Sequence, residues 1–298
     1  MVRPVIASVV LSLVAYGALA APPAPPPATP TKPVTDTYHG VSVVDPYRWL
    51  EDWDDAAVKA WSEAQNAHAR AYLDGMPNVE GIRARLTTLL SAASVSYTNL
   101  KVVKGRTFGI KHEPAKQQPM IVVMPSVREA SRERILVDPN ALDPTGLTTI
   151  DWFVPSPDGR LLAVSMSKGG SESGDLHLFR TDTGEQAGEV IPRVHGGTAG
   201  GSLAWLRNSA GFLYTRYPRA GERPAEDVDF YVQVYAHTLG TDPAQDRYEV
   251  GKEFPKIAEI VLEVSEDGSN ALASVQKGDG GEFIHFLRGP VQVEEIGR

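Results

Sequence analysis

Apolar side chains recur every three or four residues between Asp54 and Gly75, and this spacing predicts an amphipathic helix. The apolar stripe consists of Val58, Trp61, Ala64, His68, Ala71 and Tyr72. Asp54 and Asp55 suit the positive end of the helix dipole, and Gly75 followed by Pro77 ends the helix. The same spacing predicts a second helix over about 79–93, with one apolar face made of Ile82, Leu86, Leu89 and Leu90.

After Tyr97 the helical period gives way to short apolar segments separated by Gly, Pro, Asp and Asn, which is typical of all-β chains. Eleven strands are expected, at Leu100–Val103, Thr107–His112, Met120–Met124, Arg134–Val137, Leu161–Met166, Asp175–Arg180, Phe212–Arg216, Tyr231–Thr238, Ile260–Val264, Ala271–Gln276 and Phe283–Leu287. Strands with no helix between them pair antiparallel through short connections. The predicted fold class is therefore mainly β, preceded by a helical segment.

A polar turn leading into an apolar strand occurs three times. The turns contain Gly159, Gly211 and Gly268, which lie 52 and 57 residues apart, and glycine accepts the positive φ that a tight hairpin requires. One such unit per roughly 40–50 residues, plus loop insertions, is the period of a β-propeller blade. A β-sandwich with similar hairpins gives the same pattern, so the pattern alone leaves both folds open.

Charge and composition narrow the possible functions. The 298 residues include 29 basic and 37 acidic side chains, which gives a formal charge of −8. Nucleic acid is therefore not an expected partner, because phosphate binding needs a concentrated basic face. Cysteine is absent, which excludes disulfides, thiol nucleophiles, thiolate metal sites and a lipid anchor on cysteine. The hydrophobic content of 42% is that of a globular protein with a core.

Residues 1–20 have the pattern of a signal peptide. Arg3 precedes an uncharged apolar run that ends in Ala18-Leu19-Ala20, a sequence suited to cleavage. The alternative is an uncleaved membrane anchor, because the run approaches the length of a spanning helix. Residues 21–34 are interpreted as a proline-rich linker, either an extended spacer or a ligand for an SH3-type domain. We expect a periplasmic or secreted protein that is not attached to the membrane after cleavage.

No Gly-x-Ser-x-Gly nucleophile elbow of a hydrolase occurs in the sequence. The segment Gly170–Gly174 has Glu172 at its centre, and Gly200–Ala204 ends in alanine. His195–Thr198 is similar to the His-Gly-Gly of an oxyanion hole, but it has no nucleophile to serve. We interpret 170–174 as a hairpin loop and 195–198 as a glycine-rich surface loop.

Other site chemistry is equally sparse. The histidines show no close pairing typical of a metal site; they are His39, His68, His112, His177, His195, His237 and His285. Adjacent carboxylates suit solvent rather than acid–base chemistry, because neighbours on a strand point to opposite faces; the pairs are Asp54/Asp55, Glu226/Asp227 and Glu294/Glu295. Phosphate-loop and dinucleotide motifs are absent. The sequence predicts no catalytic residue, no cofactor or cofactor-binding residue, and no metal ligand in this chain.

A family resemblance rests on the segment YHGVSVVDPYRWLED at residues 38–52. It resembles the N-terminal signature of the prolyl oligopeptidase family of serine peptidases, and WSEAQN at 61–66 resembles the helix that follows it. Weaker similarities follow in the family's order; they are LVDPN at 136–140, SPDG at 156–159, GGSE at 169–172, LAW at 203–205 and LGTD at 239–242. Together they cover nearly all of the chain from about Thr35 to Leu287.

The resemblance implies a seven-bladed propeller inserted into an α/β-hydrolase domain that cleaves short peptides after proline. The propeller restricts entry to small substrates. Residues 35–96 would be the helical segment that packs on the hydrolase domain, and 97–298 a partial propeller of about four blades. The family's catalytic Ser, Asp and His would lie beyond residue 298, so the expected partners are a separate C-terminal hydrolase domain and short proline-containing peptides.

Three aromatic residues of the N-terminal signature, Tyr47, Trp49 and Trp61, are expected to dock on that hydrolase domain. Burying one aromatic side chain contributes on the order of 2–3 kcal/mol. Left exposed, these residues would favour collapse onto the strands, association with another chain, or aggregation.

Two functions follow from the sequence. The first is the N-terminal propeller portion of an exported prolyl oligopeptidase-like peptidase, present either as a truncated product or as one half of a split enzyme. The alternative is a periplasmic propeller-like module that binds a peptide or a protein without catalysis, because fold does not fix function. An open set of about four blades is a difficulty for this alternative, since closure protects the edge strands.

Overall fold

The structure is a computed structural model that describes residues 24–91, 94–267, 269–289 and 293–297. The expected signal peptide at residues 1–20 lies outside this range. The chain divides into two compact units, with the division after Leu89, and each unit is described by itself. Within the described residues no helix is both long enough and apolar enough to cross a membrane.

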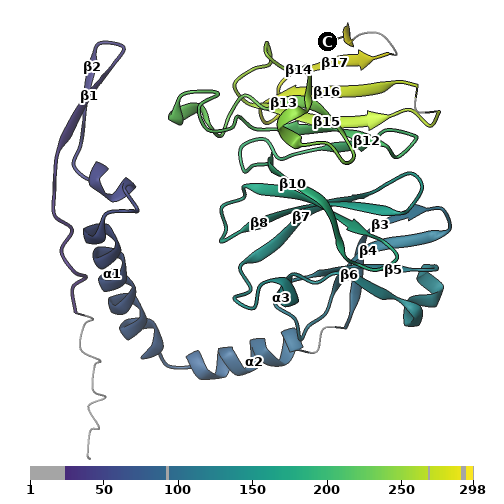
Figure 1. The fold of residues 1–298 in the computed structure, drawn as a ribbon. Helices are drawn as coiled ribbons and strands as arrows, with labels where there is room; N and C mark the ends of the chain where they lie inside the picture. The colour runs from purple at the N-terminus through teal and green to yellow at the C-terminus, as the bar shows by residue number, and fades with distance from the viewer. Residues whose placement is uncertain (1–23, 92–93, 268, 290–292, 298) are drawn as a thin grey trace, which may run out of the picture. The chain divides into compact units, whose positions relative to one another are not determined.

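The first unit contains a β-hairpin and the helical segment (Figure 1). Its elements in chain order are β1 (Val34–Tyr38), β2 (Val41–Asp45), the 3-10 helix η1 (Arg48–Glu51), α1 (Ala56–Asp74) and α2 (Val79–Ser91). The two predicted helices are confirmed within two residues at each end. The hairpin was not predicted; its turn is made by His39 and Gly40, both at positive φ (51° and 83°).

Local contacts explain where α1 begins and how η1 is fixed. The Asp55 carboxylate caps α1 by accepting a hydrogen bond of 2.8 Å from the Ala57 N–H. Arg48 in η1 contacts both strands of the hairpin, with 2.6 Å to Asp36 and 3.0 Å to Asp45. The N-terminal signature therefore forms one small structure, in which Arg48 links η1 to both strands of the hairpin.

The proline-rich residues lie along η1 and α1. The Trp49 indole N–H donates to the Pro30 carbonyl (2.9 Å), and the Trp61 indole N–H donates to the Thr29 hydroxyl (3.0 Å). The two indole rings meet edge to face at 6.4 Å between their centroids. Both tryptophans are thus half-buried within their own unit rather than left open, whereas Tyr47 is 44% exposed.

The second unit consists of four antiparallel sheets of four strands each (Figure 1). The first has β3 (Ser96–Val103), β4 (Arg106–His112), β5 (Met120–Met124) and β6 (Arg134–Val137), and the second has β7 (Thr148–Pro155), β8 (Leu161–Lys168), β9 (Gly174–Arg180) and β10 (Gln186–His195). The third has β11 (Leu203–Trp205), β12 (Gly211–Arg216), β13 (Gln233–Thr238) and β14 (Arg247–Val250), and the fourth has β15 (Ala258–Val264), β16 (Ala271–Lys277), β17 (Phe283–Arg288) and β18 (Val293–Gly297). Short helices lie in the connections: η2 (Val127–Arg132), α3 (Pro139–Leu142), η3 (Ala225–Asp227) and η4 (Pro243–Gln245).

Each sheet packs on the next through its own hydrophobic core. Phe108, Phe153 and Leu162 belong to the core between the first and second sheets. Trp205 and Phe212 belong to the core between the second and third sheets, and the third core joins the third and fourth. In β8, Leu162 and Val164 face the first sheet while Ala163 faces the third. Four sheets in series exclude a two-sheet sandwich and fit the predicted partial propeller of about four blades.

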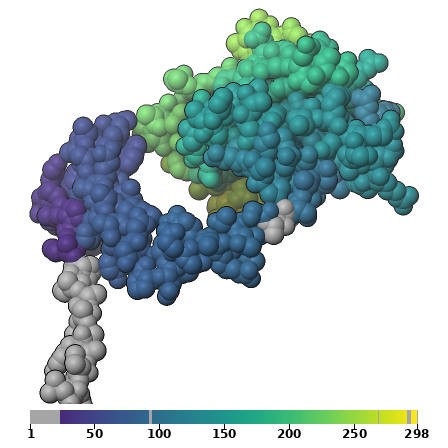
Figure 2. Space-filling view, turned by 90° about the horizontal axis from the view of Figure 1, so that it is seen from below, coloured from purple at the N-terminus to yellow at the C-terminus, as the bar shows by residue number. Residues whose placement is uncertain are grey.

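The sheets also present one continuous surface. The space-filling view shows the teal and green residues of the second unit in unbroken contact over the face that it displays (Figure 2). Hydrogen bonds join the sheets as well, since the Trp205 indole N–H donates to the Val154 carbonyl (3.0 Å) and the Leu262 N–H donates to the Ser202 hydroxyl (3.0 Å). The second unit is therefore a single packed body.

The predicted repeat of turn glycines is only partly right. Gly159 does take positive φ (71°), as expected for the β7–β8 turn. In the corresponding β11–β12 turn it is Ser209 that takes positive φ (54°), while Gly211 begins β12. A side chain at Gly211 would lie 2.2 Å from the His237 carbonyl oxygen, so close strand packing rather than turn geometry requires glycine there. Gly268 lies outside the described residues.

Candidate functional site

The strand order places the connections of each sheet at two opposite ends. We call one the loop end; it carries the β8–β9 connection (169–173), the β10–β11 connection (196–202) and the long β12–β13 loop (217–232). We call the other the turn end; it carries the short turns β7–β8, β9–β10 and β11–β12 and the β13–β14 connection. Loops supported by a rigid sheet are where binding groups concentrate.

The two serine- and histidine-containing motifs meet at the loop end. The motif at 170–174 lies in the β8–β9 connection, as the sequence predicts, and its last residue, Gly174, begins β9; the motif at 195–198 ends β10 and begins the next loop. Together they line a hollow of about 370 Å³ whose walls are Ser171, Glu172, Ser173, Arg193, His195, Gly196, Gly197, Thr198, Asp229 and Phe230. A side chain at Gly197 would lie 2.4 Å from a carboxylate oxygen of Glu172, so the two motifs touch.

Arg193 holds this hollow together. Its guanidinium donates to the carbonyls of Pro218 (3.0 Å) and Val228 (2.7 Å) and to the Asp229 carboxylate (2.8 Å). The backbone at Arg193 is at positive φ (60°), and its N–H donates to the Asp175 carboxylate (2.9 Å). Because one side chain satisfies three acceptors on the 217–232 loop, that loop is fixed against the end of β10.

Tyr217 fixes the neighbouring turn. Its hydroxyl accepts from the Ala199 N–H (3.0 Å) and lies 3.2 Å from the carbonyls of both Gly196 and Gly200, to which it donates. The ring is 1% exposed, and burial raises the pKa of its hydroxyl. The uncharged Tyr217 hydroxyl therefore holds the glycine-rich turn in place through these hydrogen bonds.

This hollow lacks an activated nucleophile. The Ser171 hydroxyl accepts from the Ser173 N–H (3.3 Å), and none of the hydrogen bonds in this described region joins a serine hydroxyl to the His195 ring. Nδ1 of His195 is buried without a partner among the described residues. A serine that is not hydrogen-bonded to a base is a weak nucleophile. The geometry thus agrees with the interpretation of both motifs as loops.

A second hollow of about 420 Å³ lies beside it at the loop end, along the 217–232 loop. Its walls are Arg216, Tyr217, Pro218, Glu222, Arg223, Pro224, Tyr231, Gln233, Tyr235 and Lys252. The Arg216 guanidinium lies 4.1 Å from the centre of the Tyr235 ring, and that of Arg223 lies 3.9 Å from Tyr231. Stacked arginine and tyrosine side chains of this kind suit flat ligand groups.

Glu222 sets the charge of this second hollow. It pairs with Arg216 at 2.9 Å and accepts from the Arg219 N–H at 2.8 Å. Burial acts to raise the pKa of the carboxyl, but the Arg219 N–H and the Arg216 guanidinium outweigh it, so the pKa is lowered. Glu222 is therefore charged, and it neutralises one of the arginines.

The sequence did not single out these arginines and tyrosines, because the 217–232 loop has neither periodicity nor a catalytic motif. The only signal was its density of Arg, Tyr and Pro, beginning at Arg216-Tyr217-Pro218-Arg219. Nor do the described residues contain any group of three or more His, Asp or Glu side chains that would hold a metal ion. The expectation that the chain binds neither metal nor cofactor stays a prediction.

Comparison with known proteins agrees with this architecture. Residues 26–290 match the family described as "Prolyl oligopeptidase, N-terminal beta-propeller domain". The prolyl endopeptidase of Elizabethkingia meningoseptica is 29% identical over 256 residues, which cover 85% of this chain and 34% of that protein. The prolyl endopeptidase of Elizabethkingia miricola is 30% identical over 227 residues, or 74% of this chain and 30% of that protein. The chain thus spans about a third of the length of these curated relatives.

Solved structures give the same result. A structure from a study of two prolyl endopeptidases has a TM-score of 0.79 and 28% identity, and the alignment covers 91% of this chain and 39% of that one. Prolyl oligopeptidase B from Galerina marginata, bound to a 35-residue substrate, has a TM-score of 0.74 at 20% identity and covers 92% and 41%, which supports the fold alone.

These matches define the class of protein as a β-propeller domain of a peptidase family. The chain belongs to the prolyl oligopeptidase family, as the motif at residues 38–52 predicted, and the part it represents is the N-terminal propeller portion.

Proposed function

We propose that this chain is the propeller portion of an exported serine peptidase that cleaves short peptides after proline. The observation that carries the proposal is the family match over residues 26–290, which includes the N-terminal signature and every strand of the four sheets except β18. The relatives named prolyl endopeptidase support the substrate class. The arginine–tyrosine hollow at the loop end offers ring faces on which a proline would stack.

In this proposal the chain positions and selects the peptide, and a C-terminal α/β-hydrolase domain performs the chemistry. There a serine attacks the carbonyl carbon, a histidine accepts its proton, and an aspartate orients the histidine. The described residues at this end contribute loops, and no hydrogen bond among them links the hydroxyl of Ser171 or Ser173 to a histidine. The propeller limits the size of peptides that reach the hydrolase domain.

The coding sequence that follows the codon for Arg298 tests the catalytic part of the proposal. We expect it to encode a Gly-x-Ser-x-Gly elbow, either in frame or in an adjacent gene. The combined protein should then cleave an N-blocked Gly-Pro chromogenic amide and react with a fluorophosphonate probe. The 298-residue chain by itself should do neither. A covalent adduct on any serine of this chain would contradict the proposal.

Size selection and export are tested separately. Peptides of increasing length should be cleaved progressively more slowly by the combined protein, and a folded protein that contains an exposed Xaa-Pro bond should resist; equal rates would remove the gating role. Mass spectrometry of the exported protein should find an N-terminus near Ala21. An intact Met1 on a membrane-bound form would support an anchor instead.

A second candidate function is peptide or protein binding without catalysis. The hollows at the loop end are compatible with it, because they need no catalytic group to hold a ligand. A chain that unfolds cooperatively as a stable monomer supports this candidate. A chain that stays soluble only together with a hydrolase chain supports the peptidase.

A further inference from the structure

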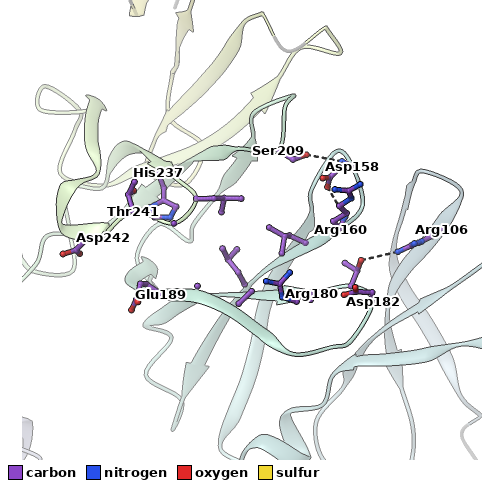
Figure 3. A pocket seen from close by; sticks show the side chains of 17 residues that line it. Arg106, Asp158, Arg160, Arg180, Asp182, Glu189, Ser209, His237, Thr241 and Asp242 are labelled. Carbon is purple, nitrogen blue, oxygen red and sulfur yellow. Dashed lines mark hydrogen bonds between the residues drawn. The ribbon is translucent and has the colours of Figure 1, made fainter.

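A hollow larger than either loop-end hollow lies at the turn end of the second unit, between the second and third sheets (Figure 3). Its volume is about 1110 Å³, more than twice that of either hollow at the loop end. Its apolar lining comes from Leu161, Leu178 and Leu239. Neither the family match nor the loop-end geometry assigns it a role. We call this hollow the turn-end groove.

Charge is distributed unevenly along the turn-end groove. Arg106, Arg160 and Arg180 lie toward one end, where Asp158 and Asp182 accompany them, and Glu189 and Asp242 lie toward the other (Figure 3). One end therefore has an excess of positive charge and the other end is negative. Among the described residues the guanidinium groups of Arg160 and Arg180 have no hydrogen-bond acceptor. Arginines without acceptors are suited to bind a carboxylate in two-pronged fashion.

The backbone that carries these arginines is rigidly held. The Thr181 hydroxyl donates to the Gly159 carbonyl (2.6 Å), and the Thr181 N–H donates to the Arg160 carbonyl (2.9 Å). Arg134 of the first sheet donates to the Thr181 carbonyl. The Asp158 N–H donates to the Ser209 hydroxyl of the third sheet (3.2 Å). A site whose walls are already fixed loses little conformational entropy when it binds a ligand.

A buried histidine lines the same groove. His237 is only 5% exposed, and its Nδ1 lies 2.7 Å from the Asp246 carboxylate, which also accepts from the Tyr214 hydroxyl at 2.7 Å. A carboxylate oxygen accepts, so Nδ1 donates to Asp246, and in the neutral ring Nε2 is left as an acceptor. Nε2 has no partner among the described residues. The ring lines the groove and Nε2 is not enclosed by protein, so this atom is open to accept a hydrogen bond from a ligand N–H.

We propose that the turn-end groove binds a short peptide with free ends. The C-terminal carboxylate lies at Arg160 and Arg180, a backbone N–H donates to Nε2 of His237, and the N-terminal ammonium lies near Glu189 and Asp242. Apolar side chains pack on the leucine lining. The site is at the opposite ends of the strands from the loop-end hollows, so it does not depend on the proposed peptidase function.

Isothermal titration calorimetry of the 298-residue chain with the tetrapeptide Ala-Ala-Leu-Leu tests this proposal. We expect a Kd between about 10 μM and 1 mM. The C-terminal amide and the N-acetyl form should each bind roughly tenfold more weakly, because each lacks one of the terminal charges. Arg160→Ala and Arg180→Ala should each weaken binding by a similar factor. Arg128→Ala, an exposed arginine outside the groove, should not.

Folding does not obscure the result, because Arg160 and Arg180 are exposed and make no side-chain hydrogen bonds within the described structure. Binding is read directly, so the outcome is independent of whether the combined protein is a peptidase. Equal affinity for the free acid and the amide would overturn the proposal. An Arg128→Ala variant that lost as much peptide affinity as Arg160→Ala would also overturn it. So would displacement of the peptide by inorganic phosphate to the same extent as by the C-terminal amide, or the absence of measurable heat at about 5 mM peptide.

Discussion

Asp143 determines the geometry of the loop that joins α3 to β7. Its carboxylate accepts from the Thr145 hydroxyl (2.5 Å), the Thr145 N–H (3.0 Å) and the Thr148 hydroxyl (2.9 Å), and the residue is 8% exposed. The Thr145 and Thr148 hydroxyls lower the pKa of the Asp143 carboxyl from 3.8 to about 2. The native state thus favours the charged form more strongly than the unfolded chain does.

The lowered pKa gives Asp143 a pH-dependent contribution to stability. The contribution is complete above the unfolded value of 3.8 and is lost as the pH falls toward the folded value of about 2. Asp143→Asn should lower Tm at pH 7, and the difference from the natural chain should shrink between about pH 4 and pH 2. Thermal melts at several pH values measure this difference. The exposed Asp182→Asn is the matched control, and a Tm difference for Asp143→Asn that is constant with pH would contradict the assignment.

Two turns show how well the sequence predicts the backbone conformation of single residues. The Asp-Gly pair at Asp158 and Gly159 correctly predicted a tight turn with positive φ at the glycine. The similar sequence at 207–211 does not follow the predicted pattern. Ser209, not Gly211, takes the positive φ, and Gly211 is required because the strands pack closely there. Local sequence specifies that a turn occurs. Which residue adopts the strained φ depends on contacts with the adjacent strand.

At the scale of elements, all eleven predicted strands exist, and the described part of the chain has seven further strands that were not predicted. Of these, β7 contains Asp151 and Pro155 and is bulged after Ile150, and β10 contains Gly188 and Pro192. β11 has only three residues, and the outer strands β14 and β18 are short and carry two charged residues each. Strands at the two edges of a sheet have fewer neighbours, so they need not carry an alternating apolar pattern.

The contact between consecutive sheets should dominate stability. Phe153 is fully buried between the first and second sheets. Phe153→Ala should therefore cost about 3–5 kcal/mol of unfolding free energy. Phe283→Ala is the matched control, since Phe283 is 47% exposed on β17 and should cost less than half as much. Urea unfolding curves measure both free energies. Equal losses would show that the core between these sheets is not the main source of stability.

The candidate site is formed by the arrangement of strands and loops, and short sequence motifs alone do not reveal it. The two short motifs at 170–174 and 195–198 were recognised in the sequence, but their meeting in one hollow required the sheet to bring β9 and β10 side by side. The 217–232 loop carries no periodicity, so its arginine–tyrosine contacts could not be predicted. The turn-end groove joins residues from Arg106 to Asp242 and is invisible without the fold.

At the scale of the whole molecule, burial differs from sheet to sheet. The second and third sheets are covered on both faces, as the nearly complete burial of β8 and β12 shows. By contrast, β3 and β18 are mostly exposed. The sequence predicts the family and the mainly β class. Which sheets are buried on both faces depends on how the sheets stack in space, and the sequence does not predict it.

Hydrogen exchange should follow this order. The backbone amides of β8 and β12 are expected to exchange most slowly, and those of β3 and β18 most rapidly, because exposed edges open without disturbing the cores between sheets. Exchange of the intact chain followed by mass spectrometry resolves these strands. Uniform protection across all four sheets would mean that the second unit opens only as a whole.

Each of the three cores formed by the described residues of the second unit draws its side chains from two successive sheets, and none of these three spans three sheets. A change in packing in one core can therefore affect a more distant core only through the sheet that lies between them. Such an arrangement tolerates duplication or loss of a whole blade during evolution, since the modules on either side can meet through surfaces of the same kind. Length variation among related domains should accordingly come in steps of one blade.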